Sequence, residues 1–332
     1  MMYIFTHTDL DGVGSAAVYL LLKGKNLRDP NVSIVYVEPY NIHQKILDYL
    51  PYFEKQDKIM VSDIGINPRV YCELKKVLKA VLEKNVTIEW YDHHRWTDEW
   101  INEFTEMNVD LHVDTSTCAA GVVAEYAKLK VRVNENIEKI VKELVHAVCA
   151  ADLWKWDHYL APKLFRIVTL NGSQGEKRRN LVLQKFTGQK LWDDELEELL
   201  EEYVNLELKN YSNIDKGLVR ICGEKCCVGL IIKTRGPPTN SFVGSYILSR
   251  FDVDVACIVK GNGSLSLRST KIDVQKIALV LGGGGHPRAA GAKVDFSLID
   301  TILFNFYPKL FLRRIGRKLL KIAEGSQLCD VQ

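Results

Sequence analysis

Three side chains that could bind a metal ion alternate along the segment His7–Gly12. In an extended backbone, residues two apart point to the same side, so His7, Asp9 and Asp11 can present one imidazole and two carboxylates to a common point. Gly12 would then let the backbone turn into a following helix. A simple turn can also contain Asp-x-Asp-Gly, so this motif needs support from other parts of the chain.

Further aspartates and histidines follow apolar segments. Asp63 ends the segment 59–62, where a lone carboxylate could equally cap the next helix. Asp92, His93 and His94 follow another apolar segment, and three polar groups there would be costly unless each found a partner. Asp152 ends an apolar helical pattern and carries a similar cost. Metal ligation would satisfy these groups.

Together these positions form a ligand set of oxygen and nitrogen atoms without thiolates: His7, Asp9, Asp11, Asp63, His93 and Asp152. Such a set favours manganese over a metal that prefers cysteine, with magnesium or cobalt as alternatives. Carboxylates crowded into one site repel one another unless cations lie between them. Two divalent ions about 3.5–4 Å apart would neutralise them and hold a hydroxide. We therefore predict a two-metal hydrolase.

The spacing of apolar residues predicts how the chain positions these side chains. Short apolar runs indicate buried strands, and helical patterns separate them. The predicted strands are 3–6, 33–37, 58–62 and 87–91, and the predicted helices are 13–23, 42–50, 70–83, 118–130 and 134–150. Alternating strands and helices indicate a parallel sheet with helices on both faces. Such sheets bind ligands at the carboxyl ends of their strands, where Asp9, Asp63 and Asp92 would converge.

The second half of the chain predicts a smaller α/β domain. Strand patterns occur at 227–234, 253–260 and 264–269, and helical patterns at 241–251 and 273–281. An acidic helical segment precedes them; we interpret it as a solvated connector rather than a partner-binding face. We predict a metal-binding domain over residues 1–190 and a substrate-binding domain over residues 216–310, with a cleft between them. A connecting helix over 191–215 would join the two domains, and a basic tail would follow over 311–332.

The order of these motifs resembles that of the DHH phosphoesterase superfamily. Its four N-terminal motifs correspond to His7-x-Asp9-x-Asp11-Gly12, Asp63, Asp92-His93-His94 and Asp152. The segment Gly282–Gly291 is similar to the signature of the DHH-associated domain. The resemblance spans most of the chain, from His7 to about Val294. One departure is that a single residue separates His7 from Asp9, where many members have three.

The resemblance implies two metal sites that share one ligand. Asp63 would bridge the two ions. The other ligands would divide between the sites, His7 and Asp9 in the first, and Asp11, His93 and Asp152 in the second.

The resemblance also implies the catalytic and substrate-binding residues. His94 would contact a substrate phosphate or a metal-bound water, and Asp92 would orient the neighbouring ligands. The C-terminal domain would hold the nucleotide that precedes the scissile phosphate. The candidate substrate contacts are Arg95, beside the triplet, and six residues of the C-terminal half: Arg268, Ser269, Gly284, Gly285, His286 and Arg288.

The resemblance is to the oligoribonuclease (nanoRNase)-like branch of the superfamily. It implies hydrolysis of phosphodiester bonds in short RNA or DNA oligonucleotides or dinucleotides, and action on adenosine bisphosphate or cyclic dinucleotides. The first alternative is a RecJ-type exonuclease on longer single strands, which would require a more extended basic groove. A second alternative is a non-catalytic replication scaffold, although every motif here keeps its acids and histidines. Inorganic pyrophosphatases share a similar metal motif, but the segment around His286 favours a nucleotide ligand.

The composition argues against several other classes of protein. The formal net charge is only +2, so no global basic field recruits long duplex nucleic acid. No stretch reaches the roughly 18 apolar residues of a membrane span, and no signal peptide is evident, so we expect a cytoplasmic protein. A homodimer is compatible with the sequence. The eight cysteines are expected to be reduced, and no matching pair at zinc spacing follows Cys222, Cys226 and Cys227.

Overall fold

The computed structural model describes residues 1–128, 133–169, 172–233 and 236–325. The chain divides into two compact units, Met1–Glu201 and Glu202–Gln332, which we call the N-terminal unit and the C-terminal unit. The boundary falls within the long acidic helix α9 (Asp194–Gly217), so the predicted connecting segment is helical. Among the described residues, no helix combines the length and the apolarity that crossing a bilayer requires.

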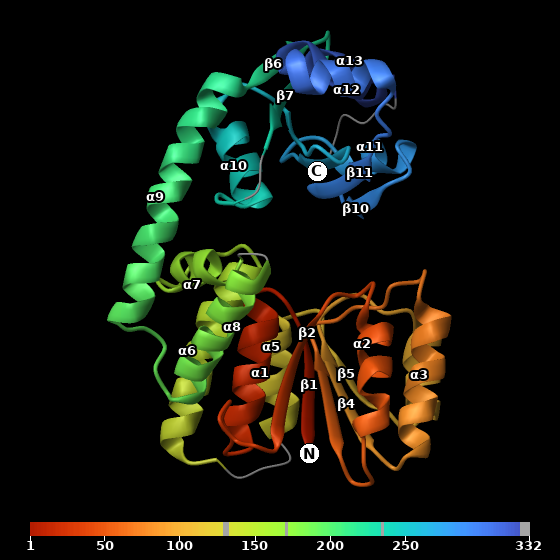
Figure 1. The fold of residues 1–332 in the computed structure, drawn as a ribbon, viewed down its shortest axis with the longest axis vertical. Helices are drawn as coiled ribbons and strands as arrows, with labels where there is room; N and C mark the ends of the chain where they lie inside the picture. Colours follow the sequence, from red (N-terminus) through yellow and green to blue (C-terminus); the bar gives the residue numbers. More distant parts are fainter. Residues whose placement is uncertain (129–132, 170–171, 234–235, 326–332) are drawn as a thin grey trace. The chain divides into compact units, whose positions relative to one another are not determined.

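The N-terminal unit is built on a five-stranded sheet (Figure 1). The strand order is β2-β1-β3-β4-β5, and every neighbouring pair is parallel. The order reverses between β1 and β3, and open α/β sheets bind ligands at such a switch point. The strands are β1 (Met2–His7), β2 (Val32–Val37), β3 (Lys58–Ser62), β4 (Thr87–Asp92) and β5 (Asp110–Val113).

Helices cover both faces of this sheet (Figure 1). On one face lie α2 (Ile42–Tyr49), the 3₁₀ turn Leu50–Tyr52, α3 (Tyr71–Glu83) and α4 (Asp98–Glu106). The other helices of the unit are α1 (Leu10–Leu22), α5 (Ala119–Lys128), α6 (Glu135–Asp152), α7 (Ala161–Val168) and α8 (Gly172–Thr187). Helix α1 is buried along its whole length because α5, α6 and α8 pack around it. The first turn of α1, which carries Asp11, is therefore rigidly held.

The structure confirms the predicted fold class. The four predicted strands agree with β1 to β4 to within one residue at each end. The short, half-buried strand β5 was not predicted, because Asp110–Val113 carries no clear apolar run. Helix α5 ends at Lys128, and the last two residues of the helix predicted at 118–130 lie outside the described residues.

The C-terminal unit has a six-stranded mixed sheet in the order β10-β11-β9-β8-β7-β6. Strands β7 and β8 are parallel, and the other neighbours are antiparallel. The strands are β6 (Val219–Cys222), β7 (Cys227–Ile232), β8 (Val255–Val259), β9 (Ser264–Arg268), β10 (Gly284–His286) and β11 (Ala289–Lys293). Its helices are α10 (Asn240–Arg250), α11 (Val274–Val280), α12 (Leu298–Phe306) and α13 (Pro308–Gly325).

The glycine-rich segment forms a hairpin at the edge of this sheet. Strands β10 and β11 pair with each other, and β11 pairs with β9, which brings Ala289 opposite Arg268. Gly285 has φ of 137°, and a Cβ there would lie 2.6 Å from the carbonyl oxygen of Ala289. Glycine is therefore required at this position, because other residues disfavour this backbone conformation and the space is filled.

The predicted basic tail belongs largely to the core of the C-terminal unit. Phe311, Ile315 and Leu319 lie on one face of α13 and are buried with side chains of β7, β8 and β9. Their spacing of four residues places them on one side of the helix, and the arginines and lysines between them are exposed. Residues 311–325 of the predicted basic tail thus form an amphipathic helix that packs within the C-terminal unit, and residues 326–332 lie outside the described residues.

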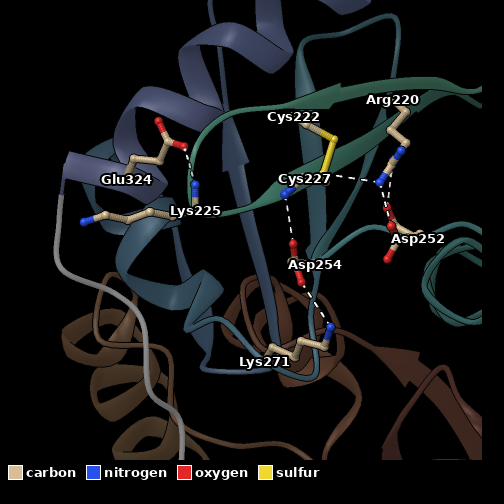
Figure 2. Close-up of a disulfide and its surroundings, with 8 residues drawn as sticks. All are labelled: Arg220, Cys222, Lys225, Cys227, Asp252, Asp254, Lys271 and Glu324. Carbon is tan, nitrogen blue, oxygen red and sulfur yellow. Dashed lines mark hydrogen bonds and ion pairs between the residues drawn. A yellow bond between two sulfur atoms is a disulfide. The ribbon is translucent and has the colours of Figure 1, made fainter.

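The expectation that the cysteines are reduced is also corrected. Cys118 and Cys149 form a disulfide between the start of α5 and α6, and Cys222 and Cys227 form a second one across the β6–β7 hairpin. Figure 2 shows this second disulfide beside Asp254, which accepts a hydrogen bond from the backbone N–H of Cys227 at 2.9 Å. The sequence did not indicate either pairing, because the partners meet only in the folded chain.

Candidate metal centre

The carboxyl ends of β1, β3 and β4 carry the predicted N-terminal motifs. His7 is the last residue of β1, and Asp9 caps α1 by accepting a hydrogen bond from the N–H of Gly12 at 3.1 Å. Asp63 follows β3 directly, and Asp92 is the last residue of β4. Because the strands are parallel, all of these residues lie along one edge of the sheet, next to the β1–β3 switch point.

Asp63 lies between two groups of ligating side chains. Its Oδ2 lies 3.3 Å from Nδ1 of His7, which is also 2.9 Å from Oδ2 of Asp9. Its Oδ1 lies 3.4 Å from Nε2 of His93. One carboxylate therefore presents one oxygen to each group, which is the geometry of a shared ligand.

The second group contains two more carboxylates. Nε2 of His93 lies 3.7 Å from Oδ2 of Asp11 and 3.7 Å from Oδ2 of Asp152, the last residue of α6. These side chains offer ligand atoms within 4.8 Å of one another, as do those of the group of His7, Asp9 and Asp63. The structure thus brings together all six predicted metal ligands.

Backbone N–H groups of α5 hold Asp11 in place. Oδ2 of Asp11 accepts a hydrogen bond from Ala119 at 2.7 Å, and Oδ1 accepts one from Ala120 at 2.8 Å. These donors belong to the N-terminal turn of α5, where the partial positive charge of the helix favours a carboxylate. Asp11 is 1% exposed, so these bonds satisfy a charge that water cannot reach.

Asp63 is held in an unusual backbone conformation. It has φ of 57°, in the left-handed region that favours glycine, and its N–H donates to the carbonyl oxygen of Tyr91 at 3.0 Å. The side chain is almost fully buried. Non-glycine residues in this region cost free energy, and they concentrate at functional sites.

The charges of the cluster suit bound cations. Burial, followed by the negative charges of neighbouring aspartates, raises the pKa of Asp11 and of Asp63 well above the ordinary range. Burial and then Asp9 raise the pKa of Asp152 to about 6. Nδ1 of His7 and Oδ2 of Asp63 are buried and, although 3.3 Å apart, have no hydrogen-bond partner of suitable geometry. Divalent cations would neutralise the carboxylates and bind both of these atoms, so the residues fit the predicted metal centre.

Asp92 and His94 form a pair at the edge of this cluster. Asp92 is fully buried; its Oδ1 lies 2.8 Å from Nδ1 of His94, and its Oδ2 accepts a hydrogen bond from Nε1 of Trp96 at 2.6 Å. The ring of His94 lies 4.7 Å from that of His93, and its side chain is 46% exposed. His94 can also join Asp63 and His93 in a third set of ligand atoms.

Glu38 is a site residue that the sequence reasoning missed. It follows β2, and its Oε2 lies 3.2 Å from Nε2 of His7. Its Oε1 accepts a hydrogen bond from the hydroxyl of Thr8 at 2.6 Å. Asp63 was predicted because it is a polar residue directly after an apolar strand. Glu38 directly follows the second strand, β2, so the same rule would have identified it.

Arg179 on α8 is a second missed residue. It is almost fully buried, donates to the carbonyl oxygen of Thr8 at 3.3 Å, and lies over the ring of Tyr36 at 5.1 Å. Burial lowers its pKa. The sequence offers no signal for it, because it follows Lys177 and Arg178 in a run that resembles a solvated helix face.

The predicted substrate contacts fall in different settings. Arg95 is exposed beside the triplet and forms no ion pair within the described part of the chain. Arg268 is half-buried in the C-terminal unit and donates to the hydroxyl of Ser241 at 3.1 Å. Four further candidates lie on the β10–β11 hairpin, which is close to Arg268. Gly284 is half-buried, and the other three are exposed: Gly285, His286 and Arg288.

The hydroxyl of Ser269, another candidate substrate contact, is buried and hydrogen-bonded within the C-terminal unit. Its side chain is 2% exposed and its hydroxyl donates to the carbonyl oxygen of Asp254 at 2.6 Å. Oγ of Ser269 in turn accepts hydrogen bonds from the backbone N–H groups of Lys271 and Ile272. The hydroxyl is therefore committed to the turn after β9, a role that its position beside Arg268 did not reveal.

Comparisons with known proteins agree with this arrangement. The DHH family, N-terminal domain, matches residues 1–151, and the DHHA1 domain matches residues 239–304. The chain is 24% identical over 311 residues to oligoribonuclease NrnB of Bacillus subtilis (strain 168), covering 91% of this chain and 75% of that protein.

Two solved structures are similar in fold. The pGpG-specific phosphodiesterase PggH from Vibrio cholerae has a TM-score of 0.57 and 14% identity, with 98% of this chain and 99% of that one covered. The exonuclease RecJ bound to manganese has a TM-score of 0.54 and 18% identity, with 96% and 89% covered. The DHH match precedes the DHHA1 match, in the same order as the motifs of the candidate site. These two matches show that the chain belongs to the DHH family of phosphoesterases, with a DHHA1 domain in its C-terminal unit.

Proposed function

We propose that this chain is a two-metal phosphodiesterase that hydrolyses short oligonucleotides or dinucleotides. The observation that carries the proposal is the position of Asp63, whose two oxygens face separate groups of ligating side chains. When bound there, two divalent cations, manganese or else magnesium or cobalt, would polarise the phosphoryl oxygens and activate the attacking water. The side chains around them would set the positions of substrate and protons.

The ligands divide between two sites that share Asp63. We assign His7 and Asp9 to the first site. The second site would use Asp11, which α5 holds rigidly, together with His93 and Asp152. Because the ligands come from β1, β3, β4, α1 and α6, the spacing between the two sites is fixed by the packed sheet and helices and needs no loop to close.

His94 is suited to contact the substrate phosphate. Asp92 binds Nδ1 of His94, so it fixes the ring and its tautomer and leaves Nε2 as the nitrogen that faces away from the protein interior. When the ring is protonated, its Nε2–H can donate a hydrogen bond to a phosphoryl oxygen or to the leaving oxygen. Asp92, with both oxygens occupied, is a positioning residue in this proposal.

The C-terminal unit would hold the nucleotide that precedes the scissile bond. Arg268, His286 and Arg288 lie on or beside the edge hairpin of its sheet and supply three phosphate donors. Gly284 carries no side chain and has open space where a Cβ would lie, so a ligand could approach the backbone closely there; glycine at position 285 is required by the hairpin itself. Ser269 would act only through the turn that it stabilises.

Two features support short substrates over long strands. The net charge of only +2 gives no support for an extended basic groove, which binding of a long nucleic-acid strand would require. The names of two similar proteins, an oligoribonuclease and a pGpG-specific phosphodiesterase, both describe short ligands. RecJ is similar in fold as well, so activity on longer single strands is the alternative to be tested.

A substrate screen with manganese tests the proposal. We expect hydrolysis of dinucleotides and of RNA or DNA of a few nucleotides, with turnover that falls as the strand lengthens. The same screen includes adenosine bisphosphate, cyclic dinucleotides and pyrophosphate. Turnover that rises with length would favour a RecJ-type exonuclease, and no hydrolysis of any substrate would contradict the proposal.

Two variants connect this activity to the metal centre. Asp63→Ala should abolish hydrolysis, because removing the shared ligand leaves neither site complete. The control is Asp114→Ala, which removes a carboxylate just after β5 at the same edge of the sheet, outside all three sets of ligand atoms. Full activity of Asp63→Ala would refute the two-metal assignment.

A further inference from the structure

Two tryptophans lie in strained positions directly after the metal-binding helix. Helix α6 ends at Asp152, and Leu153 caps it. Trp154 then has φ of 59° and Trp156 has φ of 57°. The residue after a helix cap is usually glycine when it takes this left-handed conformation, because a side chain crowds the backbone there.

The fold keeps this turn in place despite its cost. The N–H of Trp154 donates to the carbonyl oxygen of Ala151 at 3.2 Å, and the N–H of Trp156 donates to that of Ala150 at 2.8 Å. The two indole rings lie 4.7 Å apart at 70° to each other, and the ring of Phe165 braces Trp156 at 5.6 Å and 86°. The rings therefore form a rigid aromatic group with fixed orientations.

Trp154 remains accessible within this group. It is 43% exposed, although tryptophan is among the largest apolar side chains and gains most from burial. Lys155, between the two tryptophans, is also exposed. A large, rigid and accessible ring beside a cation is the arrangement with which proteins stack nucleobases along a phosphate backbone.

The turn is close to the metal centre. Asp152 lies 3.7 Å from His93 and belongs to the second group of ligands. Trp154 is two residues further along, so its Cα is at most about 7 Å from that of Asp152. A single nucleotide, measured from its phosphate to its base, spans a separation of this size.

We propose that Trp154 is a stacking platform for a nucleobase of the substrate, next to the scissile phosphate. Trp156 and Phe165 would brace the ring, and Lys155 would face the sugar-phosphate backbone. This inference rests on the proposed function and adds a substrate class to it: phosphodiesters that carry a base at this position. Because every base has an aromatic face, the platform would tolerate different sequences.

The test compares variants that remove or keep the ring. Trp154→Gly removes it and suits the left-handed backbone, so the turn should persist; Trp154→Phe keeps an aromatic face. The matched control is Trp100→Ala, which removes a partly exposed tryptophan on α4 that contacts Tyr71. The substrates are a dinucleotide and the same dinucleotide lacking one base or the other.

We expect Trp154→Gly to raise KM for the intact dinucleotide by about ten-fold, with a small change in kcat, as loss of one stacked base predicts. The variant should act on one of the two base-lacking substrates as well as the wild-type protein does. Trp154→Phe should recover most of the affinity, and Trp100→Ala should behave as wild type. An unchanged KM in Trp154→Gly, or an equal loss on all three substrates, would overturn the stacking proposal.

A binding measurement separates this proposal from the proposed function. Calorimetric titration of the dinucleotide into metal-free wild-type and Trp154→Gly protein reports stacking without turnover. If the wild-type protein hydrolyses nothing but binds the dinucleotide more tightly than Trp154→Gly, the enzymatic proposal fails and the stacking site stands. Equal binding by the two proteins refutes the stacking site whether or not the chain is an enzyme.

Discussion

Oε2 of Glu38 lies 3.2 Å from Nε2 of His7, while Nδ1 of the same ring lies 2.9 Å from Asp9. The two ring nitrogens are therefore divided between a carboxylate behind the ring and the carboxylates of the metal centre. Metal-binding histidines generally donate their second N–H to a carboxylate or carbonyl group, which fixes the ring and makes the ligating nitrogen more basic. Glu38 thus identifies Nδ1 as the nitrogen with which His7 would bind a metal.

Glu38→Gln should weaken metal binding at the first site. The amide oxygen of glutamine can still accept a hydrogen bond from His7, but it carries no charge. The amide NH2 group would then face Thr8, where the carboxylate accepts a hydrogen bond in the wild-type protein. We expect manganese affinity at this site to fall by about ten-fold, in line with the effect of other outer partners of metal ligands. Calorimetric titration measures the change, with Glu106→Gln, an exposed glutamate on α4, as the control for net charge. Unchanged affinity would show that Glu38 does not position His7.

Asp63→Gly and Asp63→Ala should both be inactive but should differ in stability. Both remove the buried charge, but only glycine also relieves the left-handed backbone at φ of 57°. We expect metal-free Asp63→Gly to be more stable than metal-free Asp63→Ala by about 1 kcal/mol, the cost of a Cβ in that conformation. Urea unfolding of the two variants measures the difference. Equal stabilities would mean that the backbone at Asp63 is not strained.

Asp152→Asn should remove one metal site and keep the other. His7, Asp9 and Asp63 remain in place, so one manganese ion should still bind, and the stoichiometry should fall from two to one. Since hydrolysis requires both ions in the proposed mechanism, kcat should fall by about 100-fold or more, as for removal of a transition-state charge stabiliser. Equilibrium dialysis gives the stoichiometry. Two ions per chain in this variant would contradict the assignment of Asp152.

The metal-free protein should lose stability as the pH rises from about 4 to about 6. The folded state raises the pKa of Asp152 from 3.8 to about 6, so it favours the protonated carboxyl. This contribution to stability is complete below pH 3.8 and disappears as the pH rises through 6. The pKa values of Asp11 and Asp63 are shifted in the same direction, and that of Asp9 is lowered, so its contribution changes only in stronger acid.

Thermal unfolding in the presence of a chelator checks this pH dependence. The melting temperature should fall from about pH 4 to about pH 6 in the wild-type protein and fall less in Asp152→Asn, whose amide does not titrate. With saturating manganese the trend should reverse, because protons no longer compete for the ligands at the higher pH. A melting temperature that rises with pH in the chelated wild-type protein would disagree with the direction of these shifts.

The sequence was sufficient for the parts of the site that follow from strand periodicity. Asp9, Asp63 and Asp92 each follow an apolar strand, and parallel strands bring their carboxyl ends together, so convergence could be predicted without coordinates. Asp11 and Asp152 were predicted as ligands, but the backbone donors at Ala119 and Ala120 were not. Those contacts depend on how α1 packs against α5, and no local pattern encodes that packing.

The remaining differences have similar origins. Ser269 was predicted as a substrate contact, but the burial of its hydroxyl depends on the turn that follows β9. The disulfide between Cys118 and Cys149 links residues 31 apart in sequence, and pairing at that distance is a property of tertiary structure. The C-terminal segment was expected to be a basic tail with the pattern of an amphipathic helix, and α13 buries its apolar face in the core of the C-terminal unit.

The hydrogen bonds that hold Asp11 join positions 108 and 109 residues apart along the chain. A ligand anchored in this way cannot be preformed in a short fragment, because closing such a loop costs entropy that only the complete sheet repays. The cluster proposed to bind the metals should therefore assemble late in folding and disassemble early when α5 detaches. For the proposed hydrolase, turnover would then report on long-range topology, and partly folded chains would hold no complete cluster.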